Sequence, residues 1–185
     1  MRWQDLVADA PRLAGVGEER LVGPGVVLVG TVRADGSPRI SPVEPLLWEG
    51  DLWLSMLWRS TKARDLGRDP RVLVHSVVTG RDGSAGEFKI RGVAVSEESR
   101  AVQEGYAAEV KECLGWEPDP GHFHLFRVEI DDVTFIRYDE PTGDQYVVRW
   151  PLGREFVRRG TTATSLGSPE VRLDLLAPPR GGPDQ

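Results

Sequence analysis

Two short segments combine residue types that can hold a phosphate group. Ser60-Thr61-Lys62 opens a predicted helix that ends at Asp69-Pro70, and Arg39 lies on a predicted strand just after an Asp35-Gly36 turn. A helix N-terminus exposes unpaired N–H groups and a partial positive charge. A hydroxyl and a lysine at that position predict a compact phosphate site. The alternative is that Ser60 and Thr61 only cap the helix, while Lys62 and Arg39 are solvated surface residues.

The strand that carries Arg39 is interrupted by proline. Pro42 and Pro45 both lie within the stretch 39–48, and proline cannot donate a hydrogen bond to a neighbouring strand. We therefore expect this strand to be bulged or to form a sheet edge for part of its length. The run Ile40-Ser41-Pro42-Val43 would then leave backbone groups free for the edge of a ligand.

Short apolar runs between tight turns dominate the middle of the chain. Strands are predicted over 26–32, 39–48, 52–57, 71–78, 87–96, 122–138 and 145–150, with 171–176 as a last candidate. Helices are predicted over 3–10, from Ser60 or Thr61 to the Asp69-Pro70 stop, and over 97–114. Pro11 is expected to end the first helix, and a loose glycine-containing segment to follow it. Strands in hairpin succession indicate a mainly β protein, a β-barrel with flanking helices.

The length and composition fit one domain of an ordinary globular protein. The 185 residues are divided into an N-terminal helix and lead-in (1–22), a barrel domain (23–177) and a flexible tail (178–185). The net charge of −6 is opposite to that of a protein that coats nucleic acid. No stretch approaches the roughly 18 apolar residues of a membrane span. We expect a cytoplasmic protein with no nucleic-acid or membrane partner.

Several residues offer chemistry that the pattern does not support further. The single cysteine, Cys113, is predicted to lie in the core on an apolar helix stripe, and it can form neither an internal disulfide nor a multi-cysteine site. His122 and His124 would share one face of a strand, but no third ligand is evident, so no metal site is expected. His75 is predicted to be a hydrogen-bonded strand residue, with haem ligation as the alternative. Trp58 lies beside the phosphate site.

Four motifs in a fixed order carry a family resemblance. They are Thr31 to Val43 (TVRADGSPRISPV), Leu52 to Ser55 (LWLS), Ser60 to Leu66 (STKARDL) and Asp69 to Val72 (DPRV). In this order and spacing they resemble the pyridoxamine 5′-phosphate oxidase-like superfamily, which includes the F420-dependent split-barrel reductases. The resemblance implies an FMN-binding split β-barrel that forms a homodimer. It places the cofactor, FMN or coenzyme F420, at the subunit interface.

The resemblance also assigns roles to residues by matching position. Arg39 and Lys62 would hold the cofactor phosphate, with Ser60 or Thr61 assisting. The ring would be lined by Ile40, Ser41, Pro42, Val43, Ser55 and Met56.

Two further matches lie later in the chain. Glu87 falls where FMN oxidases tend to have a glutamine near the ring, although a carboxylate cannot donate as an amide does. Trp150 and Arg154 are similar to a late pair that reaches the partner's cofactor.

One departure from the family bears on the substrate. Glu44 stands where the true oxidases have a lysine that grips the substrate phosphate, and a carboxylate there would repel that dianion. We therefore predict an oxidoreductase that is not a vitamin B6 oxidase, with hydride passing between FMN or F420 and an unsaturated or quinone-like small molecule. The cofactor carries such chemistry, so no catalytic side chain is required. The alternatives are a non-enzymatic flavin or haem carrier or sensor, and a barrel without cofactor that serves as an interaction module.

Overall fold

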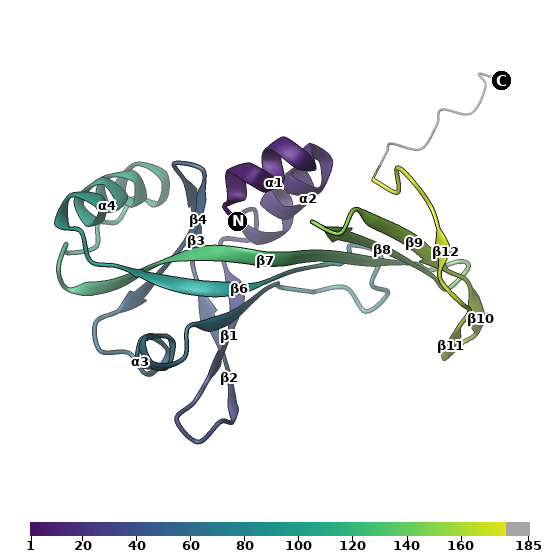
Figure 1. The fold of residues 1–185 in the computed structure, drawn as a ribbon, viewed down its shortest axis with the longest axis horizontal. Helices are drawn as coiled ribbons and strands as arrows, with labels where there is room; N and C mark the ends of the chain where they lie inside the picture. The colour runs from purple at the N-terminus through teal and green to yellow at the C-terminus, as the bar shows by residue number, and fades with distance from the viewer. Residues whose placement is uncertain (177–185) are drawn as a thin grey trace.

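Most of the chain forms one large antiparallel sheet in the computed structural model, which describes residues 1–176 (Figure 1). The strands of the sheet are β1 (Val27–Val32), β2 (Pro38–Val43), β3 (Pro45–Trp48), β4 (Asp51–Leu57), β5 (Arg71–Ser76), β6 (Glu87–Glu97), β7 (Phe123–Asp139), β8 (Asp144–Trp150), β9 (Arg154–Arg158) and β12 (Glu170–Val171). A separate hairpin consists of β10 (Gly160–Thr162) and β11 (Ser165–Leu166). The predicted mainly β fold class is confirmed. The predicted tail, 178–185, lies outside the described residues.

The long strand β7 organises the sheet. Along one edge it pairs with β6, and along the other it pairs first with β4 and then with β8. From β6 the order continues through β5 and β1 to β2, while β3 is bound only to β4. β2 comes close to β4 without pairing with it. The curled sheet is therefore open along a seam between β2 and β4.

The N-terminal helices α1 (Trp3–Asp9) and α2 (Pro11–Leu21) cover one face of the sheet (Figure 1). The expectation of a loose segment after residue 10 was wrong. Pro11 starts a second helix instead of only ending the first, because the first helical turn needs no N–H donor. Gly17 lets this helix approach the sheet closely, since an added Cβ would lie 2.6 Å from the Phe88 ring.

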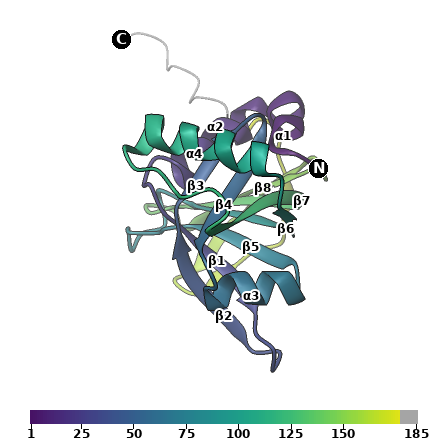
Figure 2. The ribbon, with the colours of Figure 1, turned by 90° about the vertical axis from the view of Figure 1, so that its left-hand side faces the viewer.

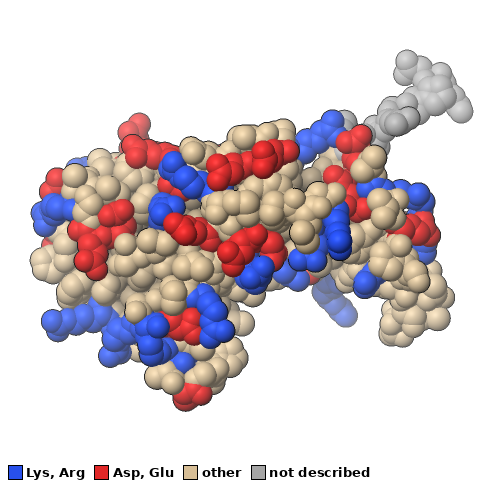
Figure 3. Space-filling model, in the orientation of Figure 1, with Lys and Arg blue, Asp and Glu red and all other residues tan. Residues whose placement is uncertain are grey.

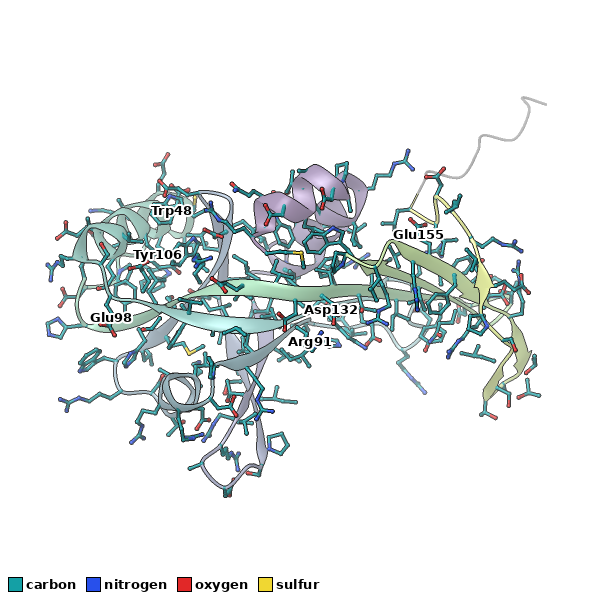
Figure 4. All side chains as sticks on the ribbon, viewed as in Figure 1. Trp48, Arg91, Glu98, Tyr106, Asp132 and Glu155 are labelled. Atoms are coloured by element: carbon teal, nitrogen blue, oxygen red, sulfur yellow. The ribbon has the colours of Figure 1, made fainter. Side chains whose placement is uncertain are left out.

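Two more helices flank the barrel, α3 (Thr61–Arg68) and α4 (Arg100–Leu114) (Figure 2). α4 packs through Tyr106 and Val110 on a second apolar cluster that includes Trp53. Tyr106 and Trp48 meet edge to face between α4 and β3, with ring centroids 6.3 Å apart (Figure 4).

Cys113 is exposed, which corrects the prediction that it lies in the core. The buried face of α4 ends at Val110, so the last helical turn has no strand beneath it and Leu114 is exposed as well. The Cys113 thiol instead donates to Glu109, one turn earlier on the solvent side.

The other differences from the predicted elements lie at breaks in strands. The predicted strand 39–48 is two strands separated at Glu44, because Pro45 begins β3 in a different ladder. The last candidate strand is reduced to β12, and β9 to β11 were not predicted. Among residues 1–176, no helix has both the length and the apolar character needed to cross a bilayer.

Candidate functional site

A cleft of about 580 Å³ lies at the seam between β2 and β4. One wall comes from the barrel and the start of α3, and consists of Pro42, Val43, Glu44, Ser55, Met56, Leu57 and Lys62. The remaining lining comes from the segment after α4, with Trp116, Pro118, Asp119 and His122, and from Phe123 at the start of β7, which pairs with Leu57. The cleft exists because β2 ends in an unpaired edge there.

The start of α3 presents groups suited to an anion. Ser60 is the N-cap residue, yet its Oγ makes no cap hydrogen bond and is a buried polar atom without a partner among residues 1–176. The first N–H groups of the helix have no acceptor within it. Lys62 Nζ donates to the Pro42 carbonyl at 3.0 Å, which holds the ammonium beside β2. Burial lowers the pKa of Lys62, and a nearby anion would favour its charged form.

Arg39, on β2, contacts the same helix through Asp65. Its Nε donates to Asp65 Oδ2 at 2.6 Å, one turn after Lys62. Thr31 Oγ1 and Arg68 also donate to the Asp65 carboxylate. Arg39 lines a groove on the outer face of the sheet rather than the cleft itself.

The structure brings part of the predicted cofactor set into the cleft. Pro42, Val43, Ser55, Met56 and Lys62 line it, and Ser60 lies at the adjoining helix start. Thr61 is an exposed residue of that first turn, and Ser41 is half-buried on β2 opposite Val29.

Besides Arg39, three further residues that were predicted to bind the cofactor lie outside the cleft. Ile40 is 71% exposed and lines the outer groove. Trp150 is packed in the core with 5% of its surface exposed, so its indole has little surface to offer a cofactor. Glu87 accepts from Lys89 Nζ at 2.6 Å and faces His75 Nε2 at 3.2 Å.

His75 is held by hydrogen bonds on both sides of its ring. Nδ1 lies 2.6 Å from the Ser76 carbonyl, and Nε2 faces the Glu87 carboxylate. The prediction of a hydrogen-bonded strand residue is therefore confirmed, and neither nitrogen is free to ligate haem in this arrangement.

The cleft lining that follows α4 was not predicted as part of the site. His122 Nδ1 pairs with Asp119 at 2.8 Å, and Trp58 stacks on His124 with ring centroids 4.8 Å apart. Asp119 and His122 lie far along the chain from the motifs, which end at Val72, and only their acidic and aromatic character could have suggested them. Trp58 lies between two of the motifs and was noted beside the phosphate site, and neither it nor His124 lines the cleft. Tyr106 lies in the helix predicted over 97–114 and was not predicted as a site residue, although its hydroxyl lies near Ser55 and Glu44.

An antiparallel barrel that is open along one seam, with a helix N-terminus at that seam, is a split β-barrel. The chain belongs to the pyridoxamine 5′-phosphate oxidase family, whose family model matches residues 17–137. The resemblance predicted from the motifs is thus confirmed.

Solved structures share this fold at low sequence identity. A NimC/NimA family protein from Clostridium acetobutylicum is 16% identical with a TM-score of 0.56, over 79% of this chain and 96% of its own. A Listeria innocua protein assigned as a pyridoxamine 5′-phosphate oxidase is 16% identical with a TM-score of 0.54, over 66% and 94%. A heme binding protein from Mycobacterium smegmatis is 19% identical with a TM-score of 0.51, over 72% and 57%. No curated protein sequence matches the chain.

Proposed function

We propose that the cleft binds FMN or F420, with the cofactor phosphate at the start of α3. The unpartnered Ser60 Oγ carries this proposal, because a buried hydroxyl without a partner is costly unless a ligand completes it. Lys62 supplies the charge and the first N–H groups of α3 supply further donors. The ring would lie against Pro42 and Val43 on one side and Ser55 and Met56 on the other.

We propose further that the protein is an oxidoreductase acting on a small molecule. A bound flavin or deazaflavin supplies hydride transfer to an unsaturated or quinone-like substrate. The chain's own residues anchor the phosphate, orient the ring and shield it from water with the apolar side chains of Met56 and Phe123. Glu44 lines the same cleft and opposes a phosphorylated substrate, so a vitamin B6 oxidase is not proposed.

The dimer belongs to the same proposal. The cleft is formed by one chain on two sides only and is open to solvent at the seam, and Glu87 lies outside it. A second copy that covers the seam would complete the site, as the family resemblance implies.

A cofactor carrier without turnover is the second candidate. The heme binding protein from M. smegmatis shares the fold, which makes haem a necessary comparison in the binding experiment. Multiple turnover with an electron acceptor distinguishes an enzyme from a carrier.

The test is a titration of the purified protein with FMN, F420 and haem, read by fluorescence and absorbance. Lys62→Ala should weaken binding of the phosphate-bearing cofactor about tenfold or more, since hydrogen bonds to charged groups contribute about 1.5–3 kcal/mol. Arg64→Ala is the matched control. Arg64 is exposed on the same helix and does not line the cleft. Its substitution therefore removes one positive charge from α3 but no contact to the proposed phosphate.

The outcomes separate the candidates. Tight binding of FMN or F420 that Lys62→Ala weakens and Arg64→Ala preserves supports the proposed site. Equal affinity for both variants, with unchanged melting temperatures, contradicts the phosphate site at α3. Binding of haem alone favours the carrier, and binding of no cofactor favours an interaction module.

A further inference from the structure

The seam cleft is lined by charged groups of both signs. Lys62 lines it at the start of α3. Two carboxylates, Glu44 and Asp119, also line the cleft, but Asp119 is paired with His122 at 2.8 Å. Glu44 takes part in no hydrogen bond or ion pair within residues 1–176. One carboxylate in the cleft is therefore available to a ligand.

The backbone holds Glu44 in place across the seam. It is the single residue between the end of β2 and the start of β3. Val43 before it and Pro45 after it are both buried, while Glu44 itself is exposed. A residue that precedes proline is confined to extended conformations. The backbone position of Glu44 beside the cleft is thus set by two strands rather than by a loop.

The floor beside Glu44 is neutral and polar. The Tyr106 side chain is buried, with 2% of its surface exposed. Burial raises the pKa of its hydroxyl, the Ser55 side chain lowers it, and the charge on Glu44 raises it further. The hydroxyl therefore keeps its proton at neutral pH. Lys62 lines the same cleft but is bonded to the Pro42 carbonyl, and within residues 1–176 it forms no ion pair with Glu44.

The walls between these groups are apolar. Met56, Phe123 and Pro118 are buried, and Trp116 is 42% exposed at the mouth. A planar or apolar body can lie against this surface, and its end would reach Glu44.

We propose that Glu44 binds a positively charged nitrogen of the substrate in the cleft, so that the substrate class is an amine carried on an apolar, aromatic body. This rests on the proposed function, because it leaves Lys62 to the cofactor phosphate. An ammonium satisfies the unpaired carboxylate with a charge-assisted hydrogen bond. An anionic substrate meets repulsion from the same group.

The test compares three probes that share one apolar body: 2-phenylethylamine, 2-phenylethanol and 3-phenylpropionate. Their affinities are measured by ligand-observed NMR titration, with the protein loaded with whichever cofactor binds and again without cofactor. The amine should bind about tenfold more tightly than the alcohol, as a charge-assisted hydrogen bond predicts. The carboxylate should bind most weakly to the loaded protein, in which the cofactor phosphate occupies Lys62. Added salt should reduce the preference.

Glu44→Gln should abolish the preference for the amine over the alcohol. Glu112→Gln, which removes an exposed carboxylate of α4 outside the cleft, should preserve it. Equal affinities for amine and alcohol, absence of amine binding, or a preference that survives Glu44→Gln would overturn the inference. If no cofactor binds but the preference for the amine depends on Glu44, the proposed function fails and the cation site stands.

Discussion

A single buried carboxylate determines how Arg39 is oriented. Asp65 is 5% exposed and receives hydrogen bonds from Arg39, Thr31 and Arg68. Arg39 is bound to Asp65 through Nε, and within residues 1–176 no hydrogen bond involves its outer guanidinium nitrogens. Asp65 therefore positions Arg39 with respect to α3, whether Arg39 serves a ligand or only the fold.

Asp65→Asn should destabilise the protein by about 1–3 kcal/mol, because it removes the charge from a buried, hydrogen-bonded pair. Burial alone would raise the pKa of Asp65, but its three donors outweigh burial and hold the pKa below the ordinary 3.8. The contribution is thus present above the unfolded pKa and is lost as the pH falls through the folded one. Urea unfolding at pH 7 and near pH 3 should show the difference between wild type and variant shrinking in acid.

The control for Asp65→Asn is Asp9→Asn, since Asp9 is exposed at the end of α1. Its effect should stay within about 0.5 kcal/mol at both pH values. A pH-independent difference for Asp65→Asn would show that packing, rather than charge, is what the variant loses.

At the scale of single residues, the motifs placed Ser60 and Lys62 at a helix start, but they did not indicate which residues Arg39 contacts. The spacing of Ser60 and Lys62 at a helix start follows from local chain geometry, so it was readable directly. The tie between Arg39 and Asp65 joins a strand to a helix 26 residues later, and no local pattern encodes it. No local pattern encodes the position of Tyr106 either, because its hydroxyl comes close to the cleft only when α4 packs over β3 and β4.

At the scale of elements, the seam results from two prolines and a strand break. β2 was expected to be bulged or an edge, and it is an edge that pairs only with β1. Pro45 starts β3 in the ladder with β4, so the chain crosses the seam in one residue. The helix α2 escaped prediction because Pro11, Gly15 and Gly17 are typical of breaks, whereas its burial against Trp3 and Phe88 overrides their weak propensity.

The long β6–β7 ladder contains a register shift that requires glycine. At Gly92 the pairing shifts, and an added Cβ would lie 2.1 Å from the Glu129 carbonyl oxygen. Gly92→Ala should lower the free energy of unfolding by about 3 kcal/mol, because backbone atoms of a paired strand cannot move aside. Gly67→Ala in α3 meets nothing within 4 Å and should stabilise the protein by about 0.5–1 kcal/mol through helix propensity. Thermal unfolding of both variants measures the contrast, and equal effects would contradict it.

At the scale of the whole molecule, charge and apolar surface are unevenly distributed. The chain carries a net charge of −6, yet Lys and Arg side chains gather around α3 (Figure 3). Arg59, Lys62, Arg64 and Arg68 all belong to this region. The basic surface lies beside the cleft, where an anionic cofactor would approach, so the field of the molecule agrees with the proposed phosphate site.

The outer face of the sheet carries an apolar groove of about 450 Å³. Ile40, Gly30 and Leu73 lie side by side in register across β2, β1 and β5. Gly30 has no side chain, so it leaves a hollow between two exposed apolar residues. We propose this surface as the interface of the dimer, since exposed apolar residues lie there beside Arg39, Arg71 and Arg91 and the groove shares β2 with the seam. A second copy seated on the groove would therefore also reach the cleft.

Leu73→Asp should convert a dimer into a monomer, because it places a charge between the exposed apolar residues of this groove, where a second copy would have to bury it. Leu73 is 42% exposed, so the monomer should fold with little change in melting temperature. Sedimentation velocity should give about twice 20.5 kDa for wild type and 20.5 kDa for the variant.

Leu173→Asp, at a leucine that is 81% exposed outside the groove, should remain dimeric. A monomeric wild type, or a dimer that survives Leu73→Asp, would remove the outer groove as the interface. Weaker cofactor binding by the Leu73→Asp monomer, with Lys62 intact, would show that the second copy completes the site.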